Sequence, residues 1–484
     1  MPKVAVRLEP PVPADLAAGF AAIRRDVGLD ADFPPGALAE ADAAARRGPS
    51  IAADGDLRDV PFVTIDPAGS RDLDQALHLE RATGATSGYV VRYAIADVAA
   101  FVTPGGALDA EVRRRGTTVY LPDGRIPLHP TVLSEGAASL LPGQDRQALV
   151  WTITLDADAD PRTADVRLER ATVRSRRQYA YPEVQAAIDA GTAGDDDDVL
   201  PLLREIGTLL LQREADRGGI SLPLPEQVVT VAGGRYELVY RAPVPAEAWN
   251  AQLSLLTGMA AARVMLDSGT GILRTLPAPA GDVVDTLRRR AAALGVPWPP
   301  EGGYSAFVRS LDERVPEHAA LVTQASRLLR GAGYEAFDHG TRPAVPVHAA
   351  VAAPYAHVTA PLRRLVDRFG SEVVLARCAG REPPAWARDG LPELPDLMAE
   401  ARHREGNADG MAVDLVEAAV LASRIGDVVR GVVVDVNKHG ARVQVQHPAV
   451  VAPVDDAHLT LGETVDLRVV SADTAARRVV LQPA

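Results

Sequence analysis

Three aspartates fall within the stretch Thr64-Ile65-Asp66-Pro67-Ala68-Gly69-Ser70-Arg71-Asp72-Leu73-Asp74-Gln75, which follows a β-rich run at residues 60–65. A proline and a glycine inside the stretch predict a turn. Asp72 and Asp74 are two residues apart, so in an extended segment their side chains lie on the same side. Asp66 can join them across the turn. The stretch therefore predicts a strand, a turn and a second strand that bring three carboxylates together.

Carboxylates packed this closely raise one another's pKa unless a cation lies among them. Hard divalent ions such as magnesium take oxygen ligands, and they usually keep several waters and a substrate phosphate in their shell. The cluster thus indicates a site for one or two Mg²⁺ ions beside a phosphate. A plain solvated acidic loop has the same spacing, so the residues by themselves leave both interpretations open.

Composition and charge narrow the class of protein. At 484 residues the chain can hold two or three domains, and its net charge of −13 argues against a basic nucleic-acid coat protein. A nucleic-acid enzyme needs only a local positive channel, so that class stays open. Lysine occurs only at Lys3 and Lys438, and arginine supplies the other cations. Arginine binds phosphate bidentately, although a GC-rich genome also explains this composition.

Other features of the sequence set expectations about location and covalent links. The first residues lack an apolar signal-peptide core, and no run of about 18 apolar residues occurs. We therefore expect a cytoplasmic protein without membrane association. Cys378 is the only cysteine, which excludes an intramolecular disulfide and a cysteine-cluster zinc site. We expect it to be a buried thiol with no disulfide partner.

Periodicity along the chain predicts three regions. Residues 1–55 form a short helical segment, residues 56–424 a mixed region of strands followed by helices, and residues 425–484 a small all-β domain. The expected helices are at 13–28, 35–47, 181–190, 198–216, 245–267, 281–294, 316–333, 362–378 and 396–424, with a loop at 383–395. The expected strands of the mixed region are at 60–65, 89–95, 117–121, 149–157 and 164–173.

The C-terminal region has the strand pattern of an OB-type barrel. Its five short β-like runs lie at 426–436, 441–445, 449–454, 464–471 and 477–482, with a turn at residues 438–440.

Four blocks of residues, in order, carry a resemblance to a known family. They lie at 64–77, 94–105, 118–146 and 355–364. With them, the segment from about 57 to 378 resembles the catalytic RNB domain of the ribonuclease II / ribonuclease R exoribonucleases. The resemblance implies an α+β fold: an RNB domain with a mixed sheet and packed helices, a C-terminal OB-fold barrel, and a short helical N-terminal segment in place of cold-shock domains.

The resemblance also implies an activity and its residues. The activity is magnesium-dependent 3′→5′ hydrolysis of single-stranded RNA to nucleoside 5′-monophosphates, by a protein that is a monomer. Asp74, Asp72 and Arg363 match the catalytic positions, with Arg363 on the scissile phosphate. The implied metal ligands are Asp66, Asp72, Asp74 and Gln75, and the implied RNA-binding residues are Tyr120, Tyr181 and Arg364.

The chain also departs from the family pattern. Gln75 stands where the family has a fourth aspartate, so it can offer magnesium an oxygen but no charge. Asn250 and Gln252 lie where relatives carry a glutamate pair. These departures support a competing hypothesis, a catalytically weakened or inactive RNA-binding protein with the same fold. A DNA nuclease is a third hypothesis, because the sequence does not reveal contacts to a 2′-hydroxyl.

Overall fold

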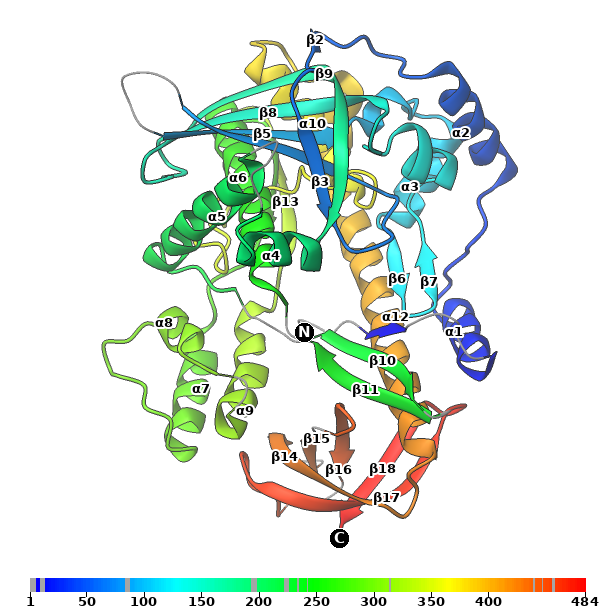
Figure 1. The fold of residues 1–484 in the computed structure, drawn as a ribbon, viewed down its shortest axis with the longest axis vertical. Helices are drawn as coiled ribbons and strands as arrows, with labels where there is room; N and C mark the ends of the chain where they lie inside the picture. The colour runs from blue at the N-terminus through cyan, green and yellow to red at the C-terminus, as the bar shows by residue number, and fades with distance from the viewer. Residues whose placement is uncertain are drawn as a thin grey trace.

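The computed structural model describes the chain except residues 1–5, 9–13, 83–87, 193–197, 222–225, 233–234, 242, 313–314, 438–439, 446 and 455–457. A large curved sheet with packed helices forms one end of the molecule, and a small closed barrel forms the other (Figure 1). The predicted α+β class, with a mixed sheet and a C-terminal barrel, is confirmed.

The large sheet has six strands in the order β2-β9-β3-β4-β5-β8. β9 pairs in parallel with β3 through its second half and antiparallel with β8 through its first half. The sheet therefore folds back on itself and encloses a core that includes Tyr93 and Trp151, which are fully buried. The strands are β2 (Gly55–Asp56), β3 (Phe62–Asp66), β4 (Gln75–Arg81), β5 (Gly88–Ala96), β8 (Asp145–Asp156) and β9 (Asp165–Ala180).

The acidic turn connects β3 to β4 at one end of this sheet. β3 ends at Asp66 and β4 begins at Gln75. Leu73 lies between Asp72 and Asp74 in the sequence and is fully buried. Its amide donates a hydrogen bond to Ser139 Oγ at 2.9 Å. This apolar anchor fixes the turn, because moving Leu73 out of the core would expose its side chain to water.

Helices cover the sheet and carry the second half of the site. α10 packs on α6 and β9, while α5 packs on α6 and β4. A satellite core joins α7, α8 and α9. The helices of the mixed region are α2 (Pro35–Arg47), α3 (Ala107–Arg115), α4 (Tyr181–Asp189), α5 (Val199–Asp216), α6 (Pro245–Ser268), α7 (Gly281–Ala293), α8 (Tyr304–Arg309), α9 (Pro316–Ala325), α10 (Leu365–Cys378) and α11 (Ala385–Gly390). Two antiparallel pairs complete it: β6 (Val119–Leu121) with β7 (Gly124–Ile126), and β12 (Gly271–Thr275) with β13 (Gly333–Phe337).

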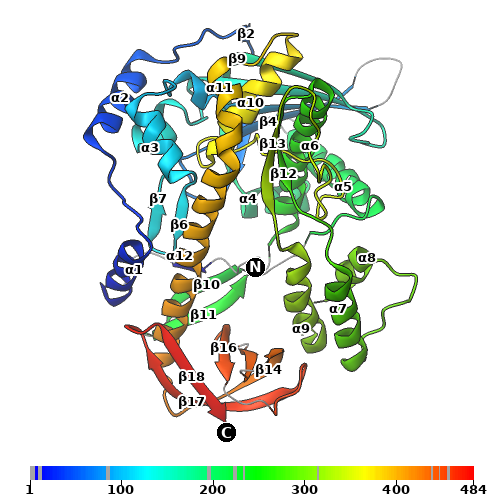
Figure 2. The same ribbon diagram turned by 180° about the vertical axis from the view of Figure 1, so that it is seen from behind.

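The helix α12 (Leu394–Ala422) runs from the sheet end of the molecule to the barrel (Figure 2). Beside it lies α1 (Ala14–Asp26), and a Cβ at Gly19 would meet Leu415 Cδ2 at 2.5 Å, so the two helices approach closely. The barrel closes in the order β14-β15-β16-β18-β17. Its strands are β14 (Val428–Asn437), β15 (Gly440–Val445), β16 (Val450–Val454), β17 (Thr464–Asp473) and β18 (Arg478–Pro483).

Some expectations from the sequence were wrong or incomplete. β1 (Val6–Leu8) pairs in parallel with β10 (Glu226–Ala232), which pairs with β11 (Arg235–Arg241), and this sheet was not predicted. The helix expected at 316–333 ends at Ala325 and continues as a short 3₁₀ turn, and α11 occupies part of the expected loop at 383–395.

The single cysteine also differs from expectation. Cys378 is exposed rather than buried, because it is the last residue of α10, where the helix leaves the core. The expected turn at 438–440 includes residues 438–439, which lie outside the described residues. No helix in the described part of the chain is both long and apolar enough to span a bilayer.

Candidate functional site

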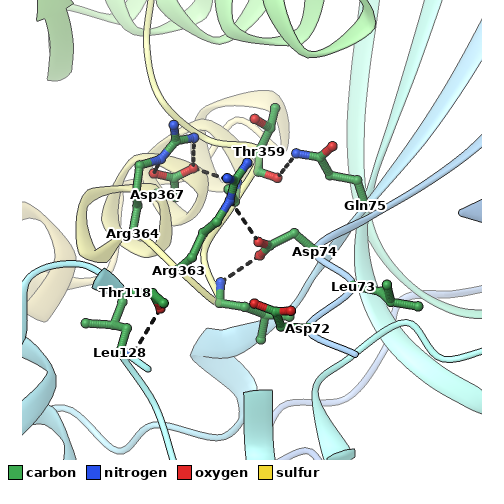
Figure 3. A network of polar contacts seen from close by, with 12 residues as sticks. Asp72, Leu73, Asp74, Gln75, Thr118, Leu128, Thr359, Arg363, Arg364 and Asp367 are labelled. Carbon is green, nitrogen blue, oxygen red and sulfur yellow. Dashed lines mark hydrogen bonds and ion pairs between the residues drawn. The ribbon is translucent and has the colours of Figure 1, made fainter. Parts of the chain in front are cut away.

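Asp74 lies in a buried position against the segment that carries Arg363. Its Oδ1 accepts a hydrogen bond from the Leu362 amide at 2.7 Å, and its Oδ2 lies 3.5 Å from Arg363 Nε (Figure 3). Burial raises the pKa of Asp74 to about 8, although Arg363 and the Leu362 hydrogen bond oppose the rise. The side chain of Arg363 is 48% exposed, so a ligand can reach it.

Asp72 lies next to Asp74 and is held by a different set of donors. Arg125 Nη1 donates to its Oδ1 at 2.5 Å, and Tyr120 Oη donates to its Oδ2 at 3.1 Å. Arg125 also pairs with Glu135 at 2.6 Å. Tyr120 as a residue is 44% exposed even though its hydroxyl is hydrogen-bonded. The hydrogen bond therefore fixes an exposed aromatic face beside the carboxylates.

Asp66 ends β3 and has a buried oxygen, Oδ2, with no hydrogen-bond partner in the structure. Burial raises the pKa of Asp66 to about 7; Arg363 opposes the rise and Asp72 adds to it. An unpartnered buried carboxylate oxygen is costly, and a bound cation would remove that cost. The carboxylate oxygens at this position therefore fit a hard divalent ion as ligands.

The aspartates do not by themselves form a complete metal cage. In the described part of the chain, no group of three or more His, Cys, Asp or Glu side chains is arranged to hold a metal ion. Magnesium is commonly bound by one or two carboxylates together with substrate phosphates and waters. The arrangement of Asp66, Asp72 and Asp74 is compatible with that mode, in which the substrate completes the coordination.

The segment that carries Arg363 is held on both sides. The Leu362 carbonyl oxygen accepts from His129 Nδ1 at 3.1 Å, which assigns the proton to that nitrogen. The Ala360 amide donates to Asp367 at 2.7 Å. A Cβ at Gly258 on α6 would lie 2.1 Å from the ring of Tyr355, so glycine is needed there for this segment to lie against α6. These contacts hold the backbone from which the Arg363 side chain projects.

Gln75 uses both ends of its amide within the protein. Its Nε2 donates to the Thr359 carbonyl oxygen at 2.7 Å, and its Oε1 accepts from Tyr93 Oη at 2.7 Å. Thr359 is buried, and its hydroxyl is 2.8 Å from Ser254 Oγ. Gln75 therefore connects the sheet to the segment that leads to Arg363.

The other predicted residues lie around this centre. Tyr181, the first residue of α4, accepts a hydrogen bond from Asn250 at 3.1 Å, and burial followed by the nearby Asp66 raises its pKa to about 12. Arg364 forms two hydrogen bonds with Asp367, at 2.8 and 2.9 Å. The side-chain amide of Gln252 donates a hydrogen bond to Glu214 on α5.

A pocket of about 300 Å³ lies beside Arg363 and Tyr120. Arg274 and Arg402 line it, and both were missed from the sequence. The hydrogen bonds described for them go to the carbonyl oxygens of Gly333 and Ala332. Together with Arg363 and Arg364 they place four arginines in a lining that holds one acidic residue, Glu405. The full lining is Thr117, Thr118, Tyr120, Arg274, Tyr334, His357, Arg363, Arg364, Met398, Arg402 and Glu405.

Comparison with known proteins gives two family matches. The RNB domain matches residues 55–372, and the RNase II-type exonuclease C-terminal S1 domain matches residues 427–484. The chain is 29% identical over 415 residues to Ribonuclease R of Escherichia coli (strain K12), covering 80% of this chain and 49% of that protein. It is 30% identical over 386 residues to Exosome complex exonuclease RRP44 homolog A of Arabidopsis thaliana, covering 76% and 40%. The chain spans about half the length of these curated relatives.

Solved structures share the fold. Mycoplasma genitalium RNase R, in complex with ribose methylated single-stranded RNA, superposes with a TM-score of 0.84 at 19% identity, covering 97% of this chain and 78% of that chain. Yeast Ssd1, described as a pseudonuclease, superposes with a TM-score of 0.70 at 13% identity, covering 93% and 57%. At these identities the likeness concerns the fold.

Proposed function

The chain belongs to the RNB-domain family, and we propose that it is a metal-dependent 3′→5′ exoribonuclease that hydrolyses single-stranded RNA to nucleoside 5′-monophosphates. One observation carries the proposal: a buried carboxylate, Asp74, lies 3.5 Å from Nε of the half-exposed Arg363 side chain, at the edge of an arginine-lined pocket. A phosphodiester placed there would lie between a metal-binding carboxylate and a cation.

The metal would be held by Asp66, Asp72 and Asp74, and the family resemblance indicates Mg²⁺. When bound, the ion supplies a water nucleophile of lowered pKa and neutralises charge on the phosphate. Asp72 accepts hydrogen bonds from Arg125 and Tyr120, so it would also position the ring of Tyr120. Gln75 was also predicted as a metal ligand, and both ends of its amide are hydrogen-bonded within the protein.

The protein's own residues supply binding and charge stabilisation. Arg363 can donate to a phosphate oxygen and oppose the negative charge that grows during cleavage. The exposed ring of Tyr120 can stack on the terminal base, and stacking tolerates every base. Tyr181 and Arg364 are the further RNA-binding residues of the proposal. Arg364 would act through the pocket wall, because its carboxylate partner Asp367 holds it there.

The S1-type barrel gives a second place for RNA to bind. Its closed five-stranded architecture is one that binds single strands in other proteins. A strand bound both at the barrel and at the pocket would be held at two points. Two-point binding favours repeated cleavage of one strand over release after each step.

A second function, RNA binding without cleavage, is supported by the glutamine at position 75. This residue removes one negative charge from the acidic stretch, and a weaker metal site follows from the lower charge. The same fold occurs in a protein described as a pseudonuclease. The two functions differ in their response to magnesium, which a cleavage assay measures directly.

The test uses oligo(A) labelled at its 5′ end, incubated with the protein and magnesium. The proposal expects a ladder of shortened labelled products that disappears with EDTA and with the Asp74→Asn variant. Label at the 3′ end must appear at once as mononucleotide, which distinguishes 3′→5′ from 5′→3′ digestion. An intact oligonucleotide that shifts in a native gel, with and without EDTA, would favour the binding function. The DNA oligonucleotide of the same sequence is run in parallel.

A further inference from the structure

We propose that Gln75 is a positioning residue rather than a metal ligand: its amide bridges Tyr93 and Thr359 and fixes the segment that presents Arg363. The inference rests on the proposed function, because positioning matters for catalysis only if Arg363 acts on a phosphate. It gives a role to the one residue of the acidic stretch that departs from the family pattern.

The bridge joins two elements far apart in sequence. Gln75 opens β4, and Tyr93 lies diagonally across from it on the antiparallel partner β5, where Leu77 faces Tyr93 and Ile95 faces Gln75. Diagonal neighbours on one face of a sheet are within reach of long side chains. The Tyr93 side chain is fully buried, and burial raises its pKa well above its usual range. Its hydroxyl therefore keeps its proton and donates to Gln75 Oε1.

The uncharged amide of Gln75 satisfies both partners. The Thr359 carbonyl requires a donor and the Tyr93 hydroxyl requires an acceptor, and a carboxylate offers acceptors alone. An ionised aspartate or glutamate at this position would place its oxygen against the carbonyl oxygen of Thr359. The family's acidic residue is therefore incompatible with this bridge.

Two consecutive residues hold the same segment at two points. Asp74 accepts from the Leu362 amide and Gln75 donates to the Thr359 carbonyl, so residues 74 and 75 span the stretch from Thr359 to Leu362 (Figure 3). Arg363 follows directly. The hydrogen bond from Gln75 adds to the contacts that His129 and Asp367 make with the same segment, and it holds the Thr359 end, where neither of those two residues bonds. Gln75 thus acts on the guanidinium through the backbone, without touching the substrate.

The experiment removes each half of the bridge in the full-length protein. Gln75→Met keeps the length of the side chain and removes both hydrogen bonds, and Tyr93→Phe removes one with almost no change in shape. We expect each to lower kcat on labelled oligo(A) at saturating magnesium, by about tenfold to a hundredfold for Gln75→Met. The double variant should be no worse than Gln75→Met, because Tyr93 has lost its acceptor already. RNA affinity in EDTA should stay close to that of the wild type.

Metal binding separates the two roles of Gln75. Titration calorimetry with Mn²⁺ and no RNA should give similar affinities for wild type and Gln75→Met if Gln75 positions the segment. A drop of about tenfold or more, with activity recovered by excess metal, would show a ligand and overturn the proposal. Unchanged kcat in both single variants would overturn it as well. Gln212→Met is the matched control, because its amide donates to Asp216 on the exposed face of α5.

A further readout does not depend on cleavage. Amide hydrogen exchange of the peptide spanning residues 355–364 should be faster in Gln75→Met and Tyr93→Phe than in the wild type, and unchanged in Gln212→Met. If the wild type does not cleave RNA, the proposed function fails while this measurement still tests the bridge. Unchanged exchange in both variants would reject the bridge even in an active enzyme.

Discussion

The carbonyl oxygen of Arg363 accepts a hydrogen bond from the backbone amide of Thr118 at 3.0 Å, two residues before Tyr120. The hydroxyl of Thr117 donates to the same oxygen at 2.9 Å. The cation and the aromatic ring therefore lie on segments that are joined through their backbones. Because the two groups are placed by one hydrogen-bonded junction, their separate contributions must be measured with side-chain changes that leave the backbone contacts intact.

Replacing Arg363 with glutamine should slow cleavage much more than it weakens RNA binding. The guanidinium is expected to oppose charge that develops during the reaction, and losing one such donor costs about 10²–10³-fold in rate. Single-turnover cleavage of labelled RNA measures the rate, and gel shift in EDTA measures the affinity. The control is Arg381→Gln, an exposed arginine after α10. A loss confined to affinity would assign Arg363 to binding alone.

Two changes at Tyr120 separate stacking from its hydrogen bond. Tyr120→Phe keeps the exposed ring and loses the hydrogen bond to Asp72, so RNA affinity should change little. Tyr120→Ala removes the ring and should cost about 1–3 kcal/mol of binding free energy. Fluorescence anisotropy with a short labelled RNA gives both values. If the phenylalanine variant bound as weakly as the alanine variant, the hydrogen bond rather than the ring would be responsible.

Asp74→Asn should abolish cleavage, preserve RNA binding and leave the protein folded. The asparagine carbonyl can still accept from the Leu362 amide, so the shape of the site is kept. Burial disfavours the ionised form of Asp74, so a neutral side chain should leave the melting temperature unchanged or raise it. Differential scanning calorimetry and gel shift check these outcomes. Equal loss of binding and cleavage would contradict a catalytic role for the carboxylate.

Metal binding should strengthen as the pH rises toward about 8. In the metal-free protein the pKa values of Asp66 and Asp74 are raised to about 7 and about 8, so both carboxyls hold protons in acid. A metal must displace these protons, and affinity should fall by about tenfold per pH unit for each proton displaced below those pKa values. Mn²⁺ calorimetry in buffers of different ionisation enthalpy measures the protons released. Affinity independent of pH would exclude both groups as ligands.

The raised pKa values of Asp66 and Asp74 also affect the stability of the metal-free protein. The pKa values of Asp66 and Asp74 in the folded protein lie above the ordinary aspartate value of 3.8, so the folded state binds these protons more tightly than the unfolded state does. Their contribution to stability is present in acid and is lost as the pH rises through about 7 and about 8. Metal should restore it, so the gain in melting temperature on adding Mn²⁺ should be larger at high pH than at low pH.

Local sequence predicted most elements of the fold and part of the site. The barrel strands and the long helices have clear periodicity, and the acidic turn is marked by its own residues. The pairing of β1 with β10 has no local signal, because the partners of Val6 and Gln227 are set by long-range packing. Arg274 and Arg402 come from a strand and a helix without any motif, so their shared pocket required the folded chain.

The role of Gln75 is likewise set by long-range contacts that local sequence does not reveal. The sequence showed that a charge was missing, and metal ligation was the natural prediction. The hydrogen-bond partners Tyr93 and Thr359 lie 18 and 284 residues away. No spacing rule could connect them, so the bridge became visible only in three dimensions.

The helix α12 has a consequence for the length of RNA that the proposed function would require. At 29 residues it is about 43 Å long, and one element contributes Met398 and Arg402 to the pocket and packs against β17 and β18 of the barrel. A continuous helix holds the pocket and the barrel at a fixed distance from each other, whereas a flexible linker would let that distance vary. Affinity plotted against oligonucleotide length should therefore rise in a step, at the length where a strand first reaches both ends.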